Sequence, residues 1–295
     1  MRKESSRSAS SSLLLIITGT FYSFGTAQVP HTLTGQFHTH KNFHSRFLPS
    51  ARDVIVYLPP GYDTNKSKRY PVLYLHDGQN LFDGATSFIK GAEWQVDETA
   101  QELIGAGKIK PLIIVGIYNT GKDRVEEYTP AVDERYKMGG KVELYGRLIV
   151  EELKPFIDSG YRTLKSARNT GIGGSSLGGL ASLYLALRYP KVFSRVAVVS
   201  PSVWWNKRMI LREVEALKKR PHLRIWLDMG TKEGGNKAEA DEATHNARLL
   251  RDALIANGWK EHSDLKYYEA EGAEHSERAW AQRVAPMLAF LFPEK

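Results

Sequence analysis

The residues best suited to chemistry lie in one glycine-rich stretch, residues 171–180. Within it, residues 174–178 read G-S-S-L-G, the G-x-S-x-G pattern in which a sharp strand-to-helix turn lifts a serine hydroxyl clear of its neighbours. We expect Ser176 to be that serine. The turn requires strained backbone angles and a close approach of helix and strand, which accounts for glycine at positions 173, 174, 178 and 179.

The surroundings of this stretch decide between a nucleophile turn and an ordinary glycine-serine loop. An apolar segment precedes it, a helical pattern follows over residues 181–189, and a second strand is expected at residues 196–199. A helix that begins at the serine directs its free N–H groups and positive dipole end at a developing oxyanion. We therefore expect the amide of Leu177 to be one oxyanion donor.

A second oxyanion donor is expected after another buried strand. Residues 70–76 form a nearly continuous apolar run that ends at Asp77-Gly78-Gln79. In sheets that carry a nucleophile turn, this loop supplies the second N–H group, and a glycine there lets the backbone approach the substrate. Taken alone, the segment is a plain Asp-Gly turn; together with Ser176 it indicates the amide of Gln79.

A serine nucleophile needs a base, and the base needs a carboxylate to orient it. His275 follows the last expected strand, so the chain offers the order serine, acid, histidine. Two residues compete for the acid. Asp228 directly ends the strand expected at residues 223–227, whereas Glu233 lies further along the loop, near glycines that would let its side chain turn inwards.

Aromatic residues and two histidines are further candidates for binding. Trp204 and Trp205 could wall an acyl or sugar pocket, although core filling by at least one of them is an equally good explanation. Trp94 is a further candidate for contact with a sugar or an aromatic acid. His38 and His40 share one face of an edge strand expected between residues 33 and 44. With no third ligand at a suitable spacing, we expect a solvated histidine face and no metal site.

Strands and helices alternate along the chain, which predicts an α/β fold with a mostly parallel central sheet and helices on both faces. Further strands are expected at residues 53–58, 111–117 and 265–268, and helices at 93–104, 142–158 and 238–257. Residues 118–140 show no clear periodicity and are expected to form a loop over the strand ends. Residues 28–295 are predicted to form a single domain.

The first 27 residues have the order of a signal peptide: basic residues, a serine-rich patch, a short apolar run and small residues before Gln28. We expect cleavage after Ala27, with an uncleaved anchor as the competing interpretation. The formal charge of +8 falls to +6 once the three basic residues and one acidic residue of the leader are removed. No nucleic-acid module accompanies the scattered basic residues, and the chain has no cysteine.

The motifs together resemble one family of α/β hydrolases. They comprise the V-Y-L-P-P-G-Y run at 56–62, L-H-D-G at 75–78, G-S-S-L-G-G at 174–179, G-T-K-E at 230–233, and E-H at 274–275 followed by Trp280. The family includes esterase D, family-one carbohydrate esterases such as feruloyl and acetylxylan esterases, siderophore trilactone esterases and mycolyltransferases. The resemblance implies Ser176 as nucleophile, His275 as base, Glu233 as acid, and the amides of Gln79 and Leu177 as oxyanion donors. Many members have aspartate where this chain has Glu233.

The sequence thus predicts a secreted or periplasmic serine esterase that acts through an acyl-enzyme and needs no cofactor. The expected partner is a small-molecule or polysaccharide ester, with acylated carbohydrates first, a siderophore ester second and acyl transfer to a sugar third. We expect no nucleic-acid partner and no stable membrane insertion after signal cleavage; the oligomeric state stays open. The alternative of another class is a non-catalytic binding protein on a hydrolase fold.

Overall fold

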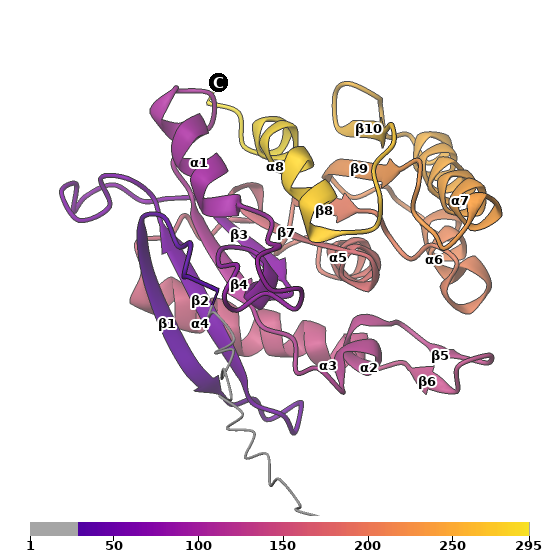
Figure 1. Cartoon of the computed structure of the whole chain (residues 1–295), viewed down its shortest axis with the longest axis horizontal. Coiled ribbons are helices and arrows are strands. Elements are labelled where there is room, and N and C mark those ends of the chain that lie inside the picture. The colour runs from indigo at the N-terminus through magenta and orange to yellow at the C-terminus, as the bar shows by residue number, and fades with distance from the viewer. Residues whose placement is uncertain (1–28, 295) are drawn as a thin grey trace, which may run out of the picture.

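The computed structural model describes residues 29–294, and the expected leader, residues 1–27, lies outside them. An eight-stranded sheet runs through the molecule from β1 at one edge to β10 at the other (Figure 1). In their order across the sheet, the strands are β1 (Gln36–Phe43), β2 (Arg52–Leu58), β4 (Ile113–Ile117), β3 (Val72–His76), β7 (Thr170–Ser175), β8 (Arg195–Val199), β9 (Arg224–Gly230) and β10 (Leu265–Ala270).

Most neighbouring strands of the sheet are parallel. β2 pairs antiparallel with β1 and β4, whereas every pair from β4 to β10 is parallel. β3 and β4 are buried along their whole length, as the continuous apolar runs of a covered parallel sheet require. Parallel strands bring their carboxyl ends to one edge, so the loops after β3, β7, β9 and β10 share a side of the molecule.

Helices cover both faces of the sheet, as predicted. α1 (Val96–Gly105) and α8 (Glu277–Leu291) pack together on one face (Figure 1). The other face is covered by α2 (Arg124–Tyr128), α3 (Val142–Arg147), a π-helical segment (Leu148–Leu153), α4 (Lys154–Gly160), α5 (Leu177–Arg188), α6 (Trp205–Glu215) and α7 (Lys237–Ala256). None of the helices between residues 29 and 294 has both the length and the apolar character needed to span a membrane.

Side chains of a single strand supply both cores. Leu73 and Leu75 of β3 enter the core beneath α1 and α8, whereas Val72 and Tyr74 enter the core on the opposite face. This alternation follows from the two-residue period of a strand. Because both faces are packed, the ends of the strands are held in a fixed arrangement.

Two local predictions were wrong and one helix was missed. Residues 118–140 contain α2 and a two-stranded hairpin, β5 (Val132–Asp133) and β6 (Met138–Gly139), whose elements are too short to show a period. The helix α6 was not predicted. β9 continues to Gly230, so Asp228 lies inside the strand rather than ending it.

The expected edge strand is β1, and its two histidines meet a tyrosine. His40 Nε2 lies 2.6 Å and His38 Nδ1 3.3 Å from the hydroxyl of Tyr161. The ring of His40 also packs edge-on against Phe156, with the ring centroids 4.8 Å apart. These contacts join the edge strand to the helical layer.

Candidate active site

Ser176 lies between β7 and α5, at the carboxyl edge of the sheet. Its backbone angles are φ 59° and ψ −123°, a strained conformation for a residue with a side chain. The strain is held from both sides, because the N–H of Ser176 donates to the carbonyl of Val199 at 3.0 Å and its carbonyl accepts from the N–H of Ser202 at 3.1 Å. The hydroxyl of Ser176 lies 3.4 Å from that of Ser202.

The packing beneath Ser176 explains why residue 173 is a glycine. A Cβ on Gly173 would lie 2.6 Å from the Cβ of Ala197, so β7 and β8 approach too closely for a side chain there. Gly178 differs, since the nearest atom to its Cβ would be 3.4 Å away, an ordinary contact. The strand side of the turn therefore requires glycine more strictly than this helix position does.

Buried His76 ends β3 and lies against the same turn. Its Nδ1 lies 2.8 Å from the hydroxyl of Tyr145, and a Cβ on Gly174 would lie 2.9 Å from its Cδ2. Burial lowers the pKa of His76 to about 4; the charge of Asp77 opposes this shift, and the charge of Arg124 adds to it. The imidazole is therefore a neutral packing group at neutral pH.

The two expected oxyanion donors lie in helical turns that follow two neighbouring strands, β7 and β3. Leu177 is the first residue of α5, where a backbone N–H has no partner within the helix. Gln79 lies in a short 3₁₀ turn after β3. Its carbonyl accepts from the hydroxyl of Thr86 at 2.8 Å, and its side-chain Oε1 accepts from the N–H of Asn119 at 3.2 Å. These bonds fix the orientation of the Gln79 peptide.

Asp77 anchors the turn that carries Gln79. It adopts left-handed backbone angles, φ 56° and ψ 46°, and its carboxylate accepts two hydrogen bonds from Arg124, at 2.7 and 2.8 Å, and one from Asn119 at 2.7 Å. Burial acts to raise the pKa of Asp77, but the charge and hydrogen bonds of Arg124 outweigh it and hold the pKa below its usual value. The bidentate Arg124 pair thus stabilises the strained turn.

His275 is paired with Glu233. Nδ1 of His275 lies 2.8 Å from Oε2 of Glu233, while Oε1 accepts hydrogen bonds from the N–H of Gly230, at 2.8 Å, and from the hydroxyl of Ser200. Glu233 is 4% exposed. Burial acts to raise its pKa, but the hydrogen bond and charge of His275, with help from Ser200 and Arg283, bring the pKa below its usual value. The carboxylate is therefore ionised and holds the imidazole.

Asp228, the competing acid, is bound elsewhere. Its carboxylate accepts hydrogen bonds from Arg283 at 2.7 Å, from the indole of Trp226 at 2.5 Å and from the N–H of Ser200 at 3.1 Å. Burial raises its pKa to about 6, although Arg283 opposes the shift. Within residues 29–294, Asp228 forms no hydrogen bond with His275, whereas Glu233 does.

Ser176 and His275 stand at the carboxyl ends of strands in the same sheet, but no hydrogen bond within the described residues joins them. Ser176 contacts Ser202 instead. Catalytic hydrogen bonds are often long in the absence of substrate and tighten when it binds. The geometry thus contains a preformed acid–base pair and a separately held serine.

The three tryptophans differ in exposure. Trp94 and Trp205 are 3% and 2% exposed, and Trp94 packs against Trp280 with ring centroids 5.6 Å apart. Their burial corrects the expectation that they touch substrate: Trp94 belongs to the core, and Trp205 supports its neighbour. Trp204 is 41% exposed and is the one of the three that lines the cavity.

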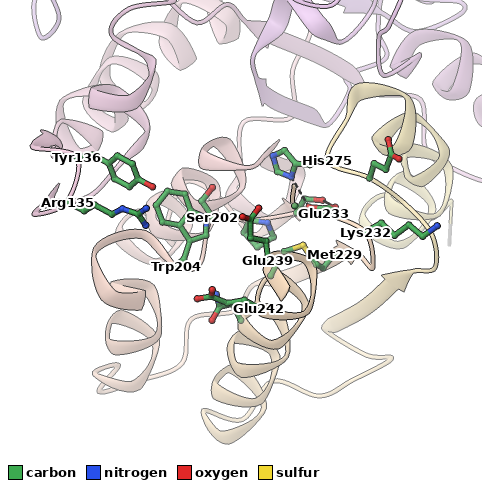
Figure 2. Close-up of a pocket in the computed structure, with 16 residues that line it drawn as sticks. Arg135, Tyr136, Ser202, Trp204, Met229, Lys232, Glu233, Glu239, Glu242 and His275 are labelled. Atoms are coloured by element: carbon green, nitrogen blue, oxygen red, sulfur yellow. Dashed lines mark hydrogen bonds and ion pairs between the residues drawn. The ribbon is translucent and has the colours of Figure 1, made fainter. Parts of the chain in front are cut away.

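A cavity of about 870 Å³ adjoins the acid–base pair. Figure 2 shows Tyr136 and Arg135 from the β5–β6 hairpin on one side of it, Trp204 beside them, and Glu239 and Glu242 of α7 opposite. Its lining residues are Arg135, Tyr136, Ser200, Pro201, Ser202, Trp204, Met229, Lys232, Glu233, Gly234, Glu239, Glu242, Ala243, Asn246, Glu274 and His275.

Sequence reasoning missed several residues of this region. Arg124 and Tyr136 lie in the stretch taken for a loop, and Ser200 and Asn246 carried no motif. Of these residues, Ser200 alone had a signal in the sequence: it is a polar residue that directly follows β8, at the carboxyl edge of the sheet where sites form. Between residues 29 and 294, no three His, Asp or Glu side chains gather in a way that could hold a metal ion.

Comparison with known proteins places this arrangement in a family. The family model described as "Putative esterase" matches residues 45–291. This chain belongs to that family. It has the α/β-hydrolase fold and is a carboxylic ester hydrolase.

Three relatives illustrate the range of the family. "Endo-1,4-beta-xylanase/feruloyl esterase" of Xylanibacter ruminicola is 29% identical over 80% of this chain and 29% of its own length. "Ferri-bacillibactin esterase BesA" of Bacillus subtilis is 28% identical over 63% of this chain and 66% of its own. The crystal structure of the BES protein from Bacillus cereus superposes with a TM-score of 0.67 at 23% identity, covering 88% of this chain and 96% of that one, which shows the shared fold.

Proposed function

We propose that the chain is an exported serine esterase that removes acyl groups from carbohydrates through an acyl-enzyme. Ser176 attacks the ester carbonyl while His275 accepts its proton, and the amides of Gln79 and Leu177 stabilise the tetrahedral oxyanion. His275 then gives the proton to the departing alcohol, and water repeats the sequence to release the acid. The observation that carries the proposal is the 2.8 Å contact between His275 and buried Glu233.

Export is part of this proposal and is supported by the order of basic, apolar and small residues in the first 27 positions. The preference for a carbohydrate is supported by the exposed Trp204 in the cavity and by the relative named a xylanase/feruloyl esterase. A siderophore ester is the second candidate, supported by the relative named a ferri-bacillibactin esterase.

The proposal is tested by treating the purified protein with a fluorophosphonate and locating the adduct by peptide mass spectrometry. We expect one adduct, on Ser176, and none in a Ser176→Ala variant that has the same circular-dichroism spectrum. Labelling of another serine would reassign the nucleophile. Folded wild-type protein that stays unlabelled would favour a binding protein on a hydrolase fold.

A further inference from the structure

The cavity beside His275 is lined by a buried amide with a spare hydrogen-bond donor. Asn246, on α7, is 2% exposed, and its Oδ1 accepts from Nε of Arg208 at 2.5 Å. That bond identifies the oxygen end of the amide, so Nδ2 is the other end. Within residues 29–294 this Nδ2 has no hydrogen-bond partner. A buried donor is unfavourable when unpaired, and Asn246 lines the cavity, so its Nδ2 is available to an acceptor that enters there.

The residue that orients Asn246 is held in a strained backbone. Asn206, Lys207 and Arg208 are three successive residues with left-handed angles, with φ of 42°, 54° and 60°. The N–H of Asn206 donates to Asp133 Oδ2 at 2.7 Å. Strain of this kind persists only where surrounding contacts impose it, and it occurs most often at ligand sites. The strained turn thus fixes Arg208, which in turn fixes the Asn246 amide.

The walls of the cavity offer flat faces and hydrogen-bond acceptors. Trp204 and Tyr136 are 41% and 44% exposed, and their ring centroids lie 5.7 Å apart. The side chain of Glu242 is 62% exposed at 3.8 Å from Arg208. Figure 2 shows Trp204, Tyr136 and Glu242 among the side chains that line the cavity. Aromatic faces fit the C–H faces of a sugar ring, while a carboxylate and an amide pair with its hydroxyls.

The position of the cavity indicates which half of an ester it would hold. His275 and Ser202 line it, whereas Gln79 and Leu177, the proposed oxyanion donors, do not. The group that protonates the departing alcohol must lie beside that oxygen. An alcohol half that lies beside His275 would extend into this cavity.

We propose that this cavity is a saccharide subsite for the alcohol half of the substrate, and that Asn246 is a specificity-determining residue that donates from Nδ2 to a sugar oxygen. Trp204 and Tyr136 stack on the ring, and Glu242 accepts from its hydroxyls. This inference rests on the proposed esterase function and assigns its specificity to the alcohol rather than to the acyl group.

The test compares two acetate esters of ring alcohols, a mono-acetylated methyl xyloside and cyclohexyl acetate. They share the acyl group and differ in the ring hydroxyls. We expect wild-type kcat/KM to be at least about tenfold higher for the sugar ester, because a site built to hydrogen-bond hydroxyls rejects an analogue without them. Asn246→Asp keeps an acceptor for Arg208 and removes the donor. It should lower kcat/KM about tenfold for the sugar ester and less than twofold for cyclohexyl acetate.

The matched control is Asn257→Asp, the same change just after the far end of α7, which should leave both esters unaffected. Equal loss on both esters by Asn246→Asp, or no wild-type preference for the sugar ester, would overturn the subsite. Calorimetry of methyl xyloside with Ser176→Ala protein separates the two proposals. Binding that Asn246→Asp abolishes supports the subsite even if neither ester is cleaved; absence of binding counts against the subsite even if Ser176 is labelled.

Discussion

Two sides of the site are built differently: the nucleophile side, which carries the proposed nucleophile Ser176, and the acid–base side, which carries the proposed pair of Glu233 and His275. Ser176 and Leu177 belong to one continuous segment, β7 and α5, whose residues are almost all buried. The acid–base side gathers the loops after β8, β9 and β10, the β5–β6 hairpin, and the first half of α7. His275 itself is exposed over 41% of its side chain.

This difference in construction points to a division between the step that breaks the ester bond and the choice of substrate. The nucleophile side is fixed by close strand packing and leaves little room for variation, since even a single methyl group at Gly173 would collide with Ala197. The acid–base side combines one buried pair with exposed side chains drawn from distant parts of the chain. We infer that the first side sets which bond is broken and the second sets which alcohol is accepted.

The largest effect should come from changing the acid. Glu233→Gln removes the charge that orients His275 and should lower kcat by about 10³–10⁴-fold with the fold retained. Asp228→Asn should lower kcat far less and instead lower the free energy of unfolding, because Arg283 loses its 2.7 Å ion pair with Asp228 and keeps the longer 3.4 Å contact with Glu233. Steady-state kinetics and urea unfolding of both variants check this. The opposite ranking would exchange the roles of the two carboxylates.

A smaller effect is expected from His76 on the nucleophile side. The unfolded chain binds a proton at this residue below pH 6.5, but the folded protein does so only near pH 4. Stability from this residue is therefore complete above pH 6.5 and is lost as the pH falls to about 4, by up to about 3 kcal/mol. His76→Gln cannot titrate, so the stability difference between wild type and variant should shrink by about 2 kcal/mol between pH 7.5 and pH 5, and by the full amount only near pH 4. Urea unfolding at pH 7.5, 6 and 5 measures it, and a constant difference would contradict the burial argument.

The close packing of the nucleophile turn around Ser176 predicts a difference in stability between variants of two of its glycines. Gly173→Ala should lower the free energy of unfolding by about 1–3 kcal/mol, because the new methyl group must displace Ala197 and the neighbouring strand. Gly178→Ala is the control. Its Cβ would have ordinary contacts and alanine favours helix, so the change should be neutral or stabilising. Thermal unfolding of the two variants compares them, and equal destabilisation would mean that the strand and helix sides are equally tight.

The smallest effect is expected at the strained turn of residues 206–208, on the acid–base side of the site. Lys207→Gly places a residue that tolerates left-handed angles at φ 54° and ψ 45°. Relief of strain should outweigh the added freedom of the unfolded chain, raising the free energy of unfolding by about 0.5–1 kcal/mol. The comparison is Lys237→Gly at the first position of α7, which should be destabilising. A loss of stability in both variants would show that the left-handed turn holds no strain.

The sequence predicted most of the sheet because its strands are buried and read as apolar runs. It predicted the nucleophile turn because the serine and the glycines around it lie within a few residues of one another. The same reasoning left open whether Glu233 or Asp228 is the acid that orients His275. Only the folded chain shows that Arg283 and Trp226 bind Asp228 while His275 contacts Glu233.

Other parts of the site depend on contacts between distant segments. Asn246 lies in an ordinary helical pattern. Its role as a candidate donor is visible only in the fold, where Arg208, 38 positions earlier, donates a hydrogen bond to its side-chain oxygen. Trp204 and Trp205 are adjacent and chemically identical, yet only the fold determines which one is exposed. Such side chains carry no local pattern, so short-range sequence analysis does not reveal them.

The order of the strands has a consequence for how the enzyme would fail. Ser176 follows β7 in the middle of the sheet, whereas His275 follows β10, an edge strand whose neighbour in the sheet is β9. Edge elements open more readily than central ones. Fraying from this edge would displace His275, the proposed base, and leave Ser176, the proposed nucleophile, in place, so inactivation would precede unfolding and would reverse on cooling.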